Sequence, residues 1–469
     1  MENQVKEPDI VKEISKAFKD LGGQAYLVGG CVRDKIMGIA PKDFDLEVYG
    51  ISADKIEPVL RKFGPVNTVG KSFCVHKIEN IDVSIPRKDS KHGAGHRGFE
   101  VEGDPTLSIH EAARRRDITI NSILEDPLTG QIEDPFNGVA DIKKKIIRAT
   151  DENLFGEDPL RVLRVCQFAA RFEFEIEPGT VKICRDVAPT LKELSQERIG
   201  EEWKKLLLKS RKPSVGLEAV KNLDVAKHLH PELIALMDCP QEPEWHPEGN
   251  VWTHTCMVTD VASKIIWREN IAEDSALTTI LGALCHDFGK PATTHKDADG
   301  RIRSPYHSEK GVAPTSSFLK TLRTSEDTEK KVRHLVLEHL NPLYLYKHRD
   351  EIRPATVRRL AVRLFPASFD ELLYVAEADY FGRTLSLEPE YPAGDWLREQ
   401  LKILELKTGG PAPILMGRHL LEQGWQAGPA MGKVLKAVFE MQIEGTVSDL
   451  DQALKEAEKF LRQIKEDAA

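Results

Sequence analysis

The chain has 469 residues and a formal net charge of −9, so its length predicts several domains and its charge excludes a generally basic nucleic-acid coat. No run of about 18 apolar residues occurs and the first residues are polar, which predicts a cytosolic protein with neither a membrane span nor a signal peptide. The seven cysteines form no C-x-x-C pair, so we expect reduced, mostly buried thiols rather than a disulfide framework or a thiolate zinc site.

The first predicted elements are a helix and a strand that lead into a glycine turn. Apolar residues recur at helical spacing over residues 9–21, and two glycines end the pattern. Residues 25–28 have the apolar, β-branched and aromatic character of a strand, and Gly29 and Gly30 follow where this strand turns into a helix. Glycines at such a turn let backbone N–H groups approach a phosphate.

Acidic and apolar residues alternate over residues 43–48, which is the pattern of a strand with one buried face. Asp43 and Asp45 therefore share one face, while the apolar residues enter a core. Two carboxylates at this separation can share Mg²⁺, which also takes substrate phosphates as ligands, and two metals would support in-line phosphoryl transfer. The alternative is a strand whose acidic residues only keep one sheet face hydrated.

A helix over residues 54–63 and a hairpin of residues 72–78 and 81–85 are predicted next. Asp82, in the second hairpin strand, is either a third carboxylate near the metals or an exposed acidic residue. Residues 86–104 are polar, basic and glycine-rich, which predicts a mobile loop with phosphate-facing charge or a solvated linker.

Three consecutive arginines end at Arg116 and are followed by Asp117 and Asn121. Arginine suits a triphosphate because its guanidinium binds oxygens in a bidentate manner and keeps its charge. Asp117 and Asn121 could hold ribose hydroxyls, and a 2′-OH contact would separate ribonucleotides from deoxynucleotides. The alternative is the charged end of a helix.

A helix over residues 158–172 is predicted to begin with Asp158 as its N-cap and Pro159 as its first residue. Arg161 lies on the same helical face as Asp158, and Arg164 lies one step further along. An aspartate acceptor beside an arginine donor fits the amino group and ring nitrogen that cytosine and adenine share. Uracil and guanine present the reverse order, so this edge would reject them by about 1–3 kcal/mol per bidentate contact.

Beyond an amphipathic neck helix over residues 195–208 and a basic boundary at 209–213, the chain carries a second group of candidate ligands. They lie in segments with helical apolar spacing: His254, His286, Asp287 and Asp379. Imidazoles with carboxylates suit a transition metal such as Mn, Fe, Ni or Zn better than a hard cation. The alternative is a fold that keeps these residues without binding a metal.

A glycine- and proline-containing linker at residues 409–412 precedes two predicted helices around a glycine turn, with Lys433 beyond. Backbone amides at the start of such a helix could meet an RNA phosphate. The alternative is a hairpin of helices that only packs.

These motifs resemble those of the polymerase-β-type nucleotidyltransferases, specifically the class II tRNA nucleotidyltransferases and bacterial poly(A) polymerases. The matching motifs are G-G-x-V-R-D followed by D-x-D, then R-R-D-x-T-x-N and E-D-x-x-R, and the resemblance covers about residues 24–460. The ordered set H…HD…D resembles the HD superfamily of metal phosphohydrolases, some of which add histidines where this chain has His307 and His339. Gln167 departs from the family pattern, which has an arginine there, and this weakens phosphate contacts from that helix.

The resemblance implies an α+β N-terminal nucleotidyltransferase head, with a mixed sheet and helices, followed by a mainly α-helical neck, HD domain and tail. The implied domains are a catalytic head over residues 1–150, a base-recognising neck over 151–212, an HD domain over 213–405 and a tRNA-contacting tail over 406–469. The segment 86–104 resembles, in length and position, the flexible loop that class II enzymes need to switch from adding C to adding A.

The resemblance also implies a CCA-adding enzyme that adds C, C and A from CTP and ATP to tRNA 3′ ends, with an additional HD phosphatase or 2′,3′-cyclic phosphodiesterase activity. Asp43 and Asp45 would be catalytic and hold Mg²⁺. The implied nucleotide-binding residues are Gly29, Gly30, Arg33, Asp34, Arg116, Asp117, Asn121, Asp158, Arg161 and Arg164. The implied transition-metal ligands are His254, His286, Asp287 and Asp379, with His307 and His339 as secondary candidates. Asp82 is the secondary candidate for the Mg²⁺ site of the head.

Other functions remain open at this point. Within the enzyme class they are A-only addition, CC-only addition and poly(A) synthesis. A different class is an HD phosphohydrolase whose head only binds RNA, and a third is a non-catalytic RNA scaffold; the intact Asp43 and Asp45 argue against both. Either a monomer or a homodimer is compatible with the sequence, and no membrane partner is expected.

Overall fold

The computed structural model describes residues 9–69, 75–91, 99–384, 390–406 and 409–466, with backbone alone at 89–91, 99–102 and 465–466. The chain divides into two compact units, and the division falls between residues 234 and 235, within helix α11 (Pro231–Met237). Residues 213–234, which the sequence assigns to the HD domain, belong to the first unit in this division; the predicted domain boundaries stay predictions. None of the described helices is long and apolar enough to cross a membrane.

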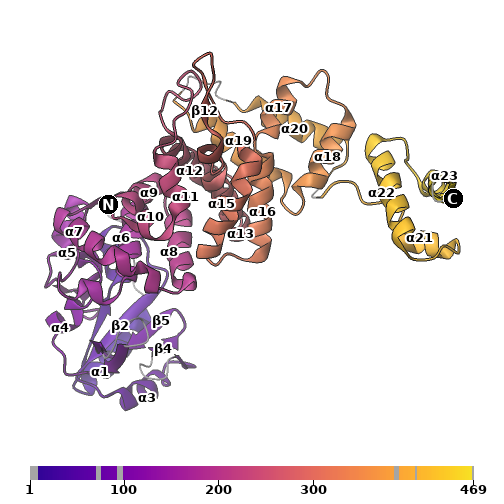
Figure 1. Ribbon diagram of the computed structural model, residues 1–469. Helices are drawn as coiled ribbons and strands as arrows, with labels where there is room; N and C mark the ends of the chain where they lie inside the picture. Colours follow the sequence, from indigo (N-terminus) through magenta and orange to yellow (C-terminus); the bar gives the residue numbers. More distant parts are fainter. Residues whose placement is uncertain (1–8, 70–74, 92–98, 385–389, 407–408, 467–469) are drawn as a thin grey trace. The chain divides into compact units, whose positions relative to one another are not determined.

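The first unit is built on a mixed sheet (Figure 1). Its described strands are β1 (Gln24–Val28), β2 (Phe44–Tyr49), β3 (Asn67–Val69), β4 (Val75–Ile78), β5 (Ile81–Ser84), β8 (Leu124–Glu125) and β9 (Ile132–Glu133). They follow the order β3-β4-β5-β2-β1-β8-β9, in which β2 and β5 are parallel and the other neighbours antiparallel. A parallel pair needs a crossover connection, which here contains helix α3 (Ile56–Leu60).

Both faces of the central strands β1 and β2 are largely buried. Helix α1 (Asp9–Asp20) buries Val11, Ile14 and Phe18 and packs on β1. Tyr26 and Tyr49 form a second cluster with alanines of helix α4 (Ile109–Arg114). The apolar residues of β2 are buried, as the alternating pattern predicts. The pattern also predicts a hydrated opposite face, but Glu47 and Tyr49 on that face are buried as well.

The neck helices pack closely behind the sheet domain. A Cβ atom at Gly216 would come within 2.7 Å of the Ala170 Cβ atom, so glycine is needed where α9 crosses α6. The predicted helices over residues 9–21, 158–172 and 195–208 are confirmed as α1, α6 and α8. The remaining elements of this unit are α2 (Gly30–Ile36), α5 (Gly138–Lys144), α6 (Leu160–Phe172), α7 (Pro178–Val187), α8 (Gln196–Leu208), α9 (Pro213–Asn222), α10 (Val225–Leu229), the short 3-10 helices η1 (Ala53–Lys55), η3 (Thr119–Asn121), η4 (Phe155–Glu157) and η5 (Ala188–Glu193), and the strands β10 (Ile146–Ile147) and β11 (Glu175–Ile176).

The prediction of a loop over residues 86–104 is wrong at both of its ends. Strand β6 (Arg87–Lys91) pairs antiparallel with strand β7 (Phe99–Gly103). The backbone hydrogen bonds of an antiparallel ladder join the two ends of this largely polar segment. Residues 92–98, where the glycines concentrate, lie outside the described residues. The predicted hairpin is confirmed as β4 and β5 over residues 75–78 and 81–84, while residues 72–74 of the prediction lie outside the described residues.

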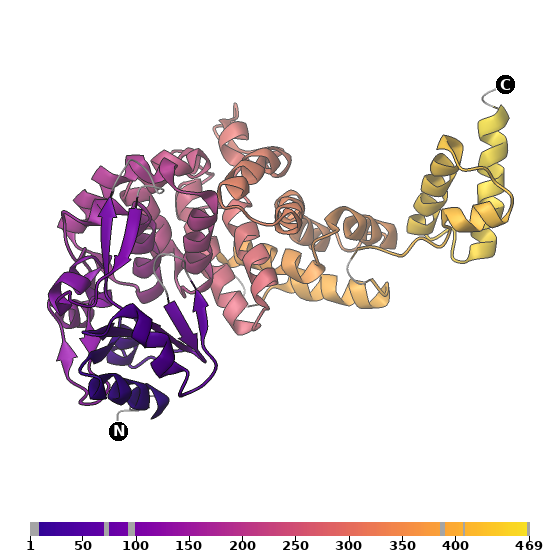
Figure 2. The same ribbon diagram turned by 90° about the horizontal axis from the view of Figure 1, so that it is seen from below.

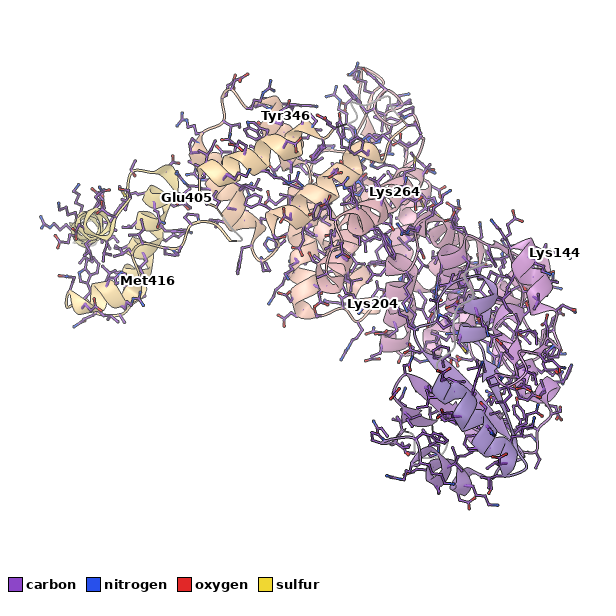
Figure 3. The ribbon with its side chains drawn as sticks, turned by 180° about the vertical axis from the view of Figure 1, so that it is seen from behind. Lys144, Lys204, Lys264, Tyr346, Glu405 and Met416 are labelled. Atoms are coloured by element: carbon purple, nitrogen blue, oxygen red, sulfur yellow. The ribbon has the colours of Figure 1, made fainter. Side chains whose placement is uncertain are left out.

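The second unit is almost entirely helical (Figure 2). Helices α12, α13, α16 and α19 pack on one another and form the core of the HD region, and Lys264 marks the exposed side of α12 in Figure 3. Its described elements are α12 (Val251–Arg268), α13 (Glu273–Cys285), α14 (Lys290–Thr293), β12 (His295–Lys296), β13 (Ile302–Arg303), α15 (His307–Thr321), α16 (Glu326–Glu338), α17 (Asn341–Lys347), α18 (Pro354–Leu364), α19 (Phe369–Phe381) and α20 (Pro392–Ile403).

The predicted tail helices are confirmed, and a third helix follows them. They are α21 (Gly417–Glu422), α22 (Pro429–Glu444) and α23 (Leu450–Glu466), and they share a hydrophobic cluster that includes Leu420 and Val434. Figure 3 labels Glu405, just after α20, and Met416, just before α21, on either side of the predicted linker.

Candidate functional sites

A cavity of about 620 Å³ in the first unit brings most of the predicted nucleotide site together. It lies between the glycine turn after β1, strand β2 and one face of α6. The predicted residues that line it are Gly29, Gly30, Arg33, Asp45, Arg116, Asp117, Asn121, Asp158, Arg161 and Arg164. Asp34, Asp43 and Asp82 do not line the cavity itself, but Asp34 is hydrogen bonded to Arg33 and Asp82 pairs in register with Asp45.

The carboxylates on β2 and β5 are aligned by the parallel pairing. Asp45 pairs in register with Asp82, and Lys77 on the neighbouring strand lies 2.6 Å from the Asp82 carboxylate. Partial desolvation in the cavity raises the pKa of Asp45, and the negative charges of Asp82 and Asp43 raise it further against the opposing charge of Arg116. A bound cation would relieve this crowding of negative charge. Asp82 therefore lies beside the predicted metal ligands and also in the ion pair expected of an exposed hairpin residue.

The glycine turn brings backbone close to the arginine cluster. Gly29 has φ of 72°, a left-handed conformation that favours glycine, and a Cβ atom there would lie 2.9 Å from Arg116 Nη1. Arg33, in the following helix α2, is buried and stacks on Phe172 with its guanidinium carbon 4.8 Å from the ring centroid. Asp34 accepts hydrogen bonds from Arg33, so it orients this arginine instead of facing the cavity.

The predicted ribose residues form one network with two arginines. Asn121 donates to Asp117 over 3.0 Å and accepts from Arg33, and Arg164 Nε donates to the other Asp117 oxygen over 2.7 Å. Burial acts to raise the pKa of Asp117, but the charge of Arg164 and the hydrogen bonds outweigh it and lower the pKa. Asp117 is thus a buried, ionised residue that joins the arginine motif to helix α6.

Both residues of the predicted base-reading edge line the cavity. Pro159 already has helical dihedral angles and Asp158 before it is extended, so Asp158 has the predicted N-cap position and Pro159 the predicted first helical position. The Asp158 carboxylate accepts from the Leu160 N–H over 3.1 Å, as an N-cap side chain does.

The Arg161 N–H donates to the Asp158 carbonyl oxygen over 3.0 Å, but the two side chains are held by other partners. Asp158 accepts a hydrogen bond from Arg198 of α8 over 2.8 Å. Arg161 donates to the carbonyl oxygens of Leu154, over 2.5 Å, and Arg115, over 2.6 Å. These two bonds use two of the five guanidinium donors, so Arg161 is held in place by its own backbone surroundings and keeps donors for a ligand.

Sequence reasoning missed part of this cavity wall. Glu47 could have been found, because it continues the two-residue spacing of Asp43 and Asp45; it accepts from Tyr49 over 2.6 Å and lies 3.5 Å from both Arg115 and Arg116. Phe168 and Arg171 also line the cavity, and their helical spacing from Arg161 and Arg164 on α6 could have been used. Arg87 belongs to the basic segment 86–104. Three further lining residues come from α8 and its C-terminal end, and no local signal marks them: Arg198, Lys205 and Lys209.

In the second unit, the structure brings the predicted metal ligands into one buried cluster. His254 Nε2 lies 3.1 Å from Asp379 Oδ1 and 3.3 Å from His286 Nε2, and the latter lies 3.2 Å from Asp287. The secondary candidates join on the other side of Asp287: His307 Nε2 lies 3.5 Å from it, and the rings of His307 and His339 are 5.4 Å apart. Asp287 therefore belongs to two potential ligand groups.

The histidine rings of this cluster are oriented for metal binding. Nδ1 of His286, His307 and His339 each faces a backbone carbonyl three residues earlier, at 2.7, 2.8 and 2.7 Å. Because Nδ1–H donates there, Nε2 is left as an acceptor directed at the other ligands. Within the described residues, His307 Nε2 has no hydrogen-bond partner although it is buried. These donors fit a divalent transition metal.

The charges of the cluster also fit a cation. Burial acts to raise the pKa of Asp287, but His286 and Lys290 hold it well below the usual range. Burial acts in the same way on Asp379, and there Arg383 and His254 hold the pKa well below the usual range. Burial, together with the nearby histidines, lowers the pKa of His339 to about 3. Ionised carboxylates and a neutral imidazole are the protonation states that metal binding requires.

Close backbone packing fixes the second half of the cluster. A Cβ atom at Gly289 would lie 1.9 Å from the carbonyl oxygen of His307, so glycine two residues after Asp287 is needed for α15 to approach.

Sequence reasoning missed two residues beside His254, namely Glu248 and His246. Glu248 is buried and contacts His254 and His246, and their hydrogen bonds lower its pKa to about 2 although burial acts to raise it.

The fold and the two sites define a nucleotidyltransferase head joined to an HD domain. Three family models match the chain: the poly A polymerase head domain at residues 25–148, the probable RNA and SrmB-binding site of polymerase A at 173–237, and the HD domain at 251–382. The enzyme class and the presence of an HD domain are thereby confirmed.

Curated relatives then narrow the class. The multifunctional CCA protein of Xanthomonas campestris pv. campestris (strain B100) is 34% identical over 421 residues, which cover 87% of this chain and 95% of the relative. That of Acinetobacter baumannii (strain SDF) is 32% identical over 392 residues, covering 81% and 90%. The chain belongs to the multifunctional CCA protein family.

Solved structures confirm the predicted fold. The CCA-adding enzyme of Bacillus stearothermophilus in complex with CTP superimposes with a TM-score of 0.65 at 22% identity, over 99% of this chain and all of the other. The Thermotoga maritima CCA-adding enzyme complexed with tRNA gives 0.58 at 20% identity, over 98% and 97%. At this identity the likeness concerns the fold: an α+β head followed by helical domains.

Proposed function

We propose that this protein adds C, C and A from CTP and ATP to the 3′ end of tRNA, with Mg²⁺ at Asp43 and Asp45. One observation carries the proposal: a single cavity is lined by a catalytic-type carboxylate, the arginine cluster and the base-reading edge of α6. The relatives are named CCA proteins, and solved structures of similar fold contain CTP, ATP or tRNA. A cytosolic location is part of the same proposal.

The residues of the chain would divide the work as follows. Mg²⁺ would neutralise phosphate charge and help to activate the RNA 3′-hydroxyl. Gly29 and Gly30 leave room for the phosphates, and Arg33 and Arg116 add positive charge beside them. Asp117 and Asn121, which line the same cavity, would bind ribose hydroxyls.

Base choice would come from Asp158 and Arg161. The carboxylate accepts from an exocyclic amino group and the guanidinium donates to a ring nitrogen, a pair that cytosine and adenine both offer. Because Asp158 pairs with Arg198 in the unliganded protein, binding of the base exchanges one charge-assisted hydrogen bond for another. The remaining Arg161 contacts to backbone oxygens keep the donor in place during that exchange.

The test is nucleotide addition to a tRNA that ends before CCA, with each nucleotide alone and in combination. We expect addition of two C residues with CTP alone and completion of CCA when ATP is added. Addition of A alone to a tRNA already ending in CC, addition that stops after CC, or long A tails would instead identify an A-adding enzyme, a CC-adding enzyme or a poly(A) polymerase.

For the second site we propose a transition metal held by His254, His286, Asp287 and Asp379, with phosphatase or 2′,3′-cyclic phosphodiesterase activity. His307 and His339, with Asp287, would supply a second metal or phosphate contact. His286→Ala combined with Asp287→Ala should remove bound Mn, Fe, Ni or Zn and the phosphate-releasing activity without altering tail addition. Unchanged metal content in that variant would contradict the assignment.

Two further roles belong to this proposal. The tail helices α21 and α22, with Lys433, would contact tRNA phosphates, and either a monomer or a homodimer would serve the two sites. Tail deletion after Glu405 should then weaken tRNA binding while leaving CTP binding unchanged. The alternative of an HD phosphohydrolase with an RNA-binding head is disfavoured by the carboxylates on β2, which such a head would not need.

A further inference from the structure

We propose that Glu248 is a positioning residue of the histidine cluster, which holds the His254 ring so that its Nε2 faces the metal. The inference rests on the proposed metal site in the HD domain. Glu248 would not itself bind the metal; its effect would pass through His254. Sequence motifs of the HD type do not include it, because it lies in the segment before α12.

The contact between Glu248 and His254 is short and shielded from solvent. Glu248 Oε1 lies 3.0 Å from His254 Nδ1, and the side chains of Glu248 and His254 are 1% and 0% exposed. Nδ1 also faces the Gly382 carbonyl oxygen at 3.1 Å, so the ring N–H has two acceptors on the side opposite the cluster. A carboxylate acceptor makes the imidazole a stronger metal donor than a carbonyl does, because it stabilises positive charge on the ring.

The other three histidines show why His254 needs this partner. His286, His307 and His339 lie at helix ends, where each Nδ1–H reaches a carbonyl of the preceding turn. His254 lies inside α12, and its Nδ1 faces no carbonyl of its own helix. Its orientation therefore depends on acceptors from elsewhere in the fold, and Glu248 supplies the charged one.

The segment that carries Glu248 is itself fixed. Asn250 caps α12 by accepting from the Thr253 N–H over 2.9 Å, and its amide donates to the Met237 carbonyl over 2.6 Å. His246 lies 2.9 Å from the same Glu248 oxygen, and its ring is 4.6 Å from the His254 ring. Glu248 is thus held between two imidazoles and cannot rotate freely toward the other ligands.

The experiment titrates the metal-free full-length protein with Co²⁺, by calorimetry and by visible absorption. Glu248→Gln keeps the shape but removes the charge, and Glu248→Ala removes both. Glu244→Gln is the matched control, since Glu244 lies in the same segment but is 54% exposed and pairs with Arg301. The double variant His286→Ala with Asp287→Ala gives the background from metal bound elsewhere.

We expect Co²⁺ affinity at the cluster to fall about tenfold in Glu248→Gln and about a hundredfold in Glu248→Ala, with a shifted visible spectrum in both and no change in Glu244→Gln. A merely structural role would lower the melting temperature and leave the affinity and spectrum of the folded protein unchanged. If the alanine variant does not fold, the isosteric glutamine variant decides.

Two results would overturn the inference alone. One is wild-type affinity and spectrum in both Glu248 variants; the other is loss of a whole metal equivalent in Glu248→Gln, which would make Glu248 a ligand. If instead the wild-type protein shows no Co²⁺ binding beyond the background variant, the proposed metal site fails and the inference fails with it.

Discussion

The side chains of the two sites are held in position by different interactions. In the head, charged side chains from distant segments neutralise one another around an open cavity, as Arg33, Asn121, Asp117 and Arg164 do. In the HD domain, three of the imidazoles are oriented by backbone carbonyls three residues earlier in the chain. A site for a large anion needs many hydrogen-bond donors. A site for a small cation instead needs a few histidine rings whose tautomers are fixed by hydrogen bonds. Mutations should therefore act through charge in the first site and through ring orientation in the second.

The largest expected effect separates the two sites completely. Asp45→Asn should lower nucleotide addition by at least about 10³-fold, because it removes a charge that would hold the metal, while HD-site metal content stays at the wild-type level. Addition to a tRNA lacking CCA and metal analysis of the same preparation measure both. Asp54→Asn, at an exposed position of η1, is the matched control and should change neither. Normal CTP incorporation by Asp45→Asn would contradict the assignment.

A smaller effect tests how the head reads the base. Arg161→Ala should cost CTP and ATP about 1–3 kcal/mol each and UTP and GTP much less, so that selectivity falls toward uniform poor use. Arg198→Gln should leave the preference for C and A intact, because it frees Asp158 without removing the donor. Kinetics with all four nucleotides on a tRNA lacking CCA distinguish the two. A wild-type preference in Arg161→Ala would show that α6 does not select the base.

The smallest expected effect uses a buried histidine outside the cluster. His230 accepts from Trp203 Nε1 over 3.0 Å, and burial lowers its pKa to about 3. The pKa of such a histidine is lower in the folded protein than its unfolded value of about 6.5, so protonation favours unfolding. The stabilising contribution is complete at a pH above about 6.5 and is lost as the pH falls toward 3. The loss is about 2 kcal/mol by pH 5. Hydrogen exchange of the neck helices measures this loss. His230→Gln should flatten the pH dependence, and His228→Gln should not; added transition metal should have no effect on either.

Local patterns predicted the fold well because each motif begins an element with its own signal, such as the glycine turn after β1 and the helix after Pro159. They could not place Arg198 or Lys209, since these reach the cavity only through helix packing. Asp158 could be predicted as an N-cap because an acidic residue followed by proline is a local start signal for a helix. Glu248 had no local signal, since a buried carboxylate in an irregular segment resembles any surface glutamate. The catalytic and ligand roles themselves stay predictions.

The parallel pairing of β2 with β5 has a consequence for the order of folding. Strands β4 and β5 are neighbours in the chain and can close as a hairpin early, with Lys77 opposite Asp82. The pairing of Asp45 with Asp82 joins distant parts of the chain and brings like charges together, both of which slow a contact. We therefore expect Lys77 to reach Asp82 before Asp45 does, so that the counter-charge is in place when the carboxylates meet. The pairing of β2 with β5, which completes the proposed metal-binding edge, would then form late, after the hairpin of β4 and β5 has formed.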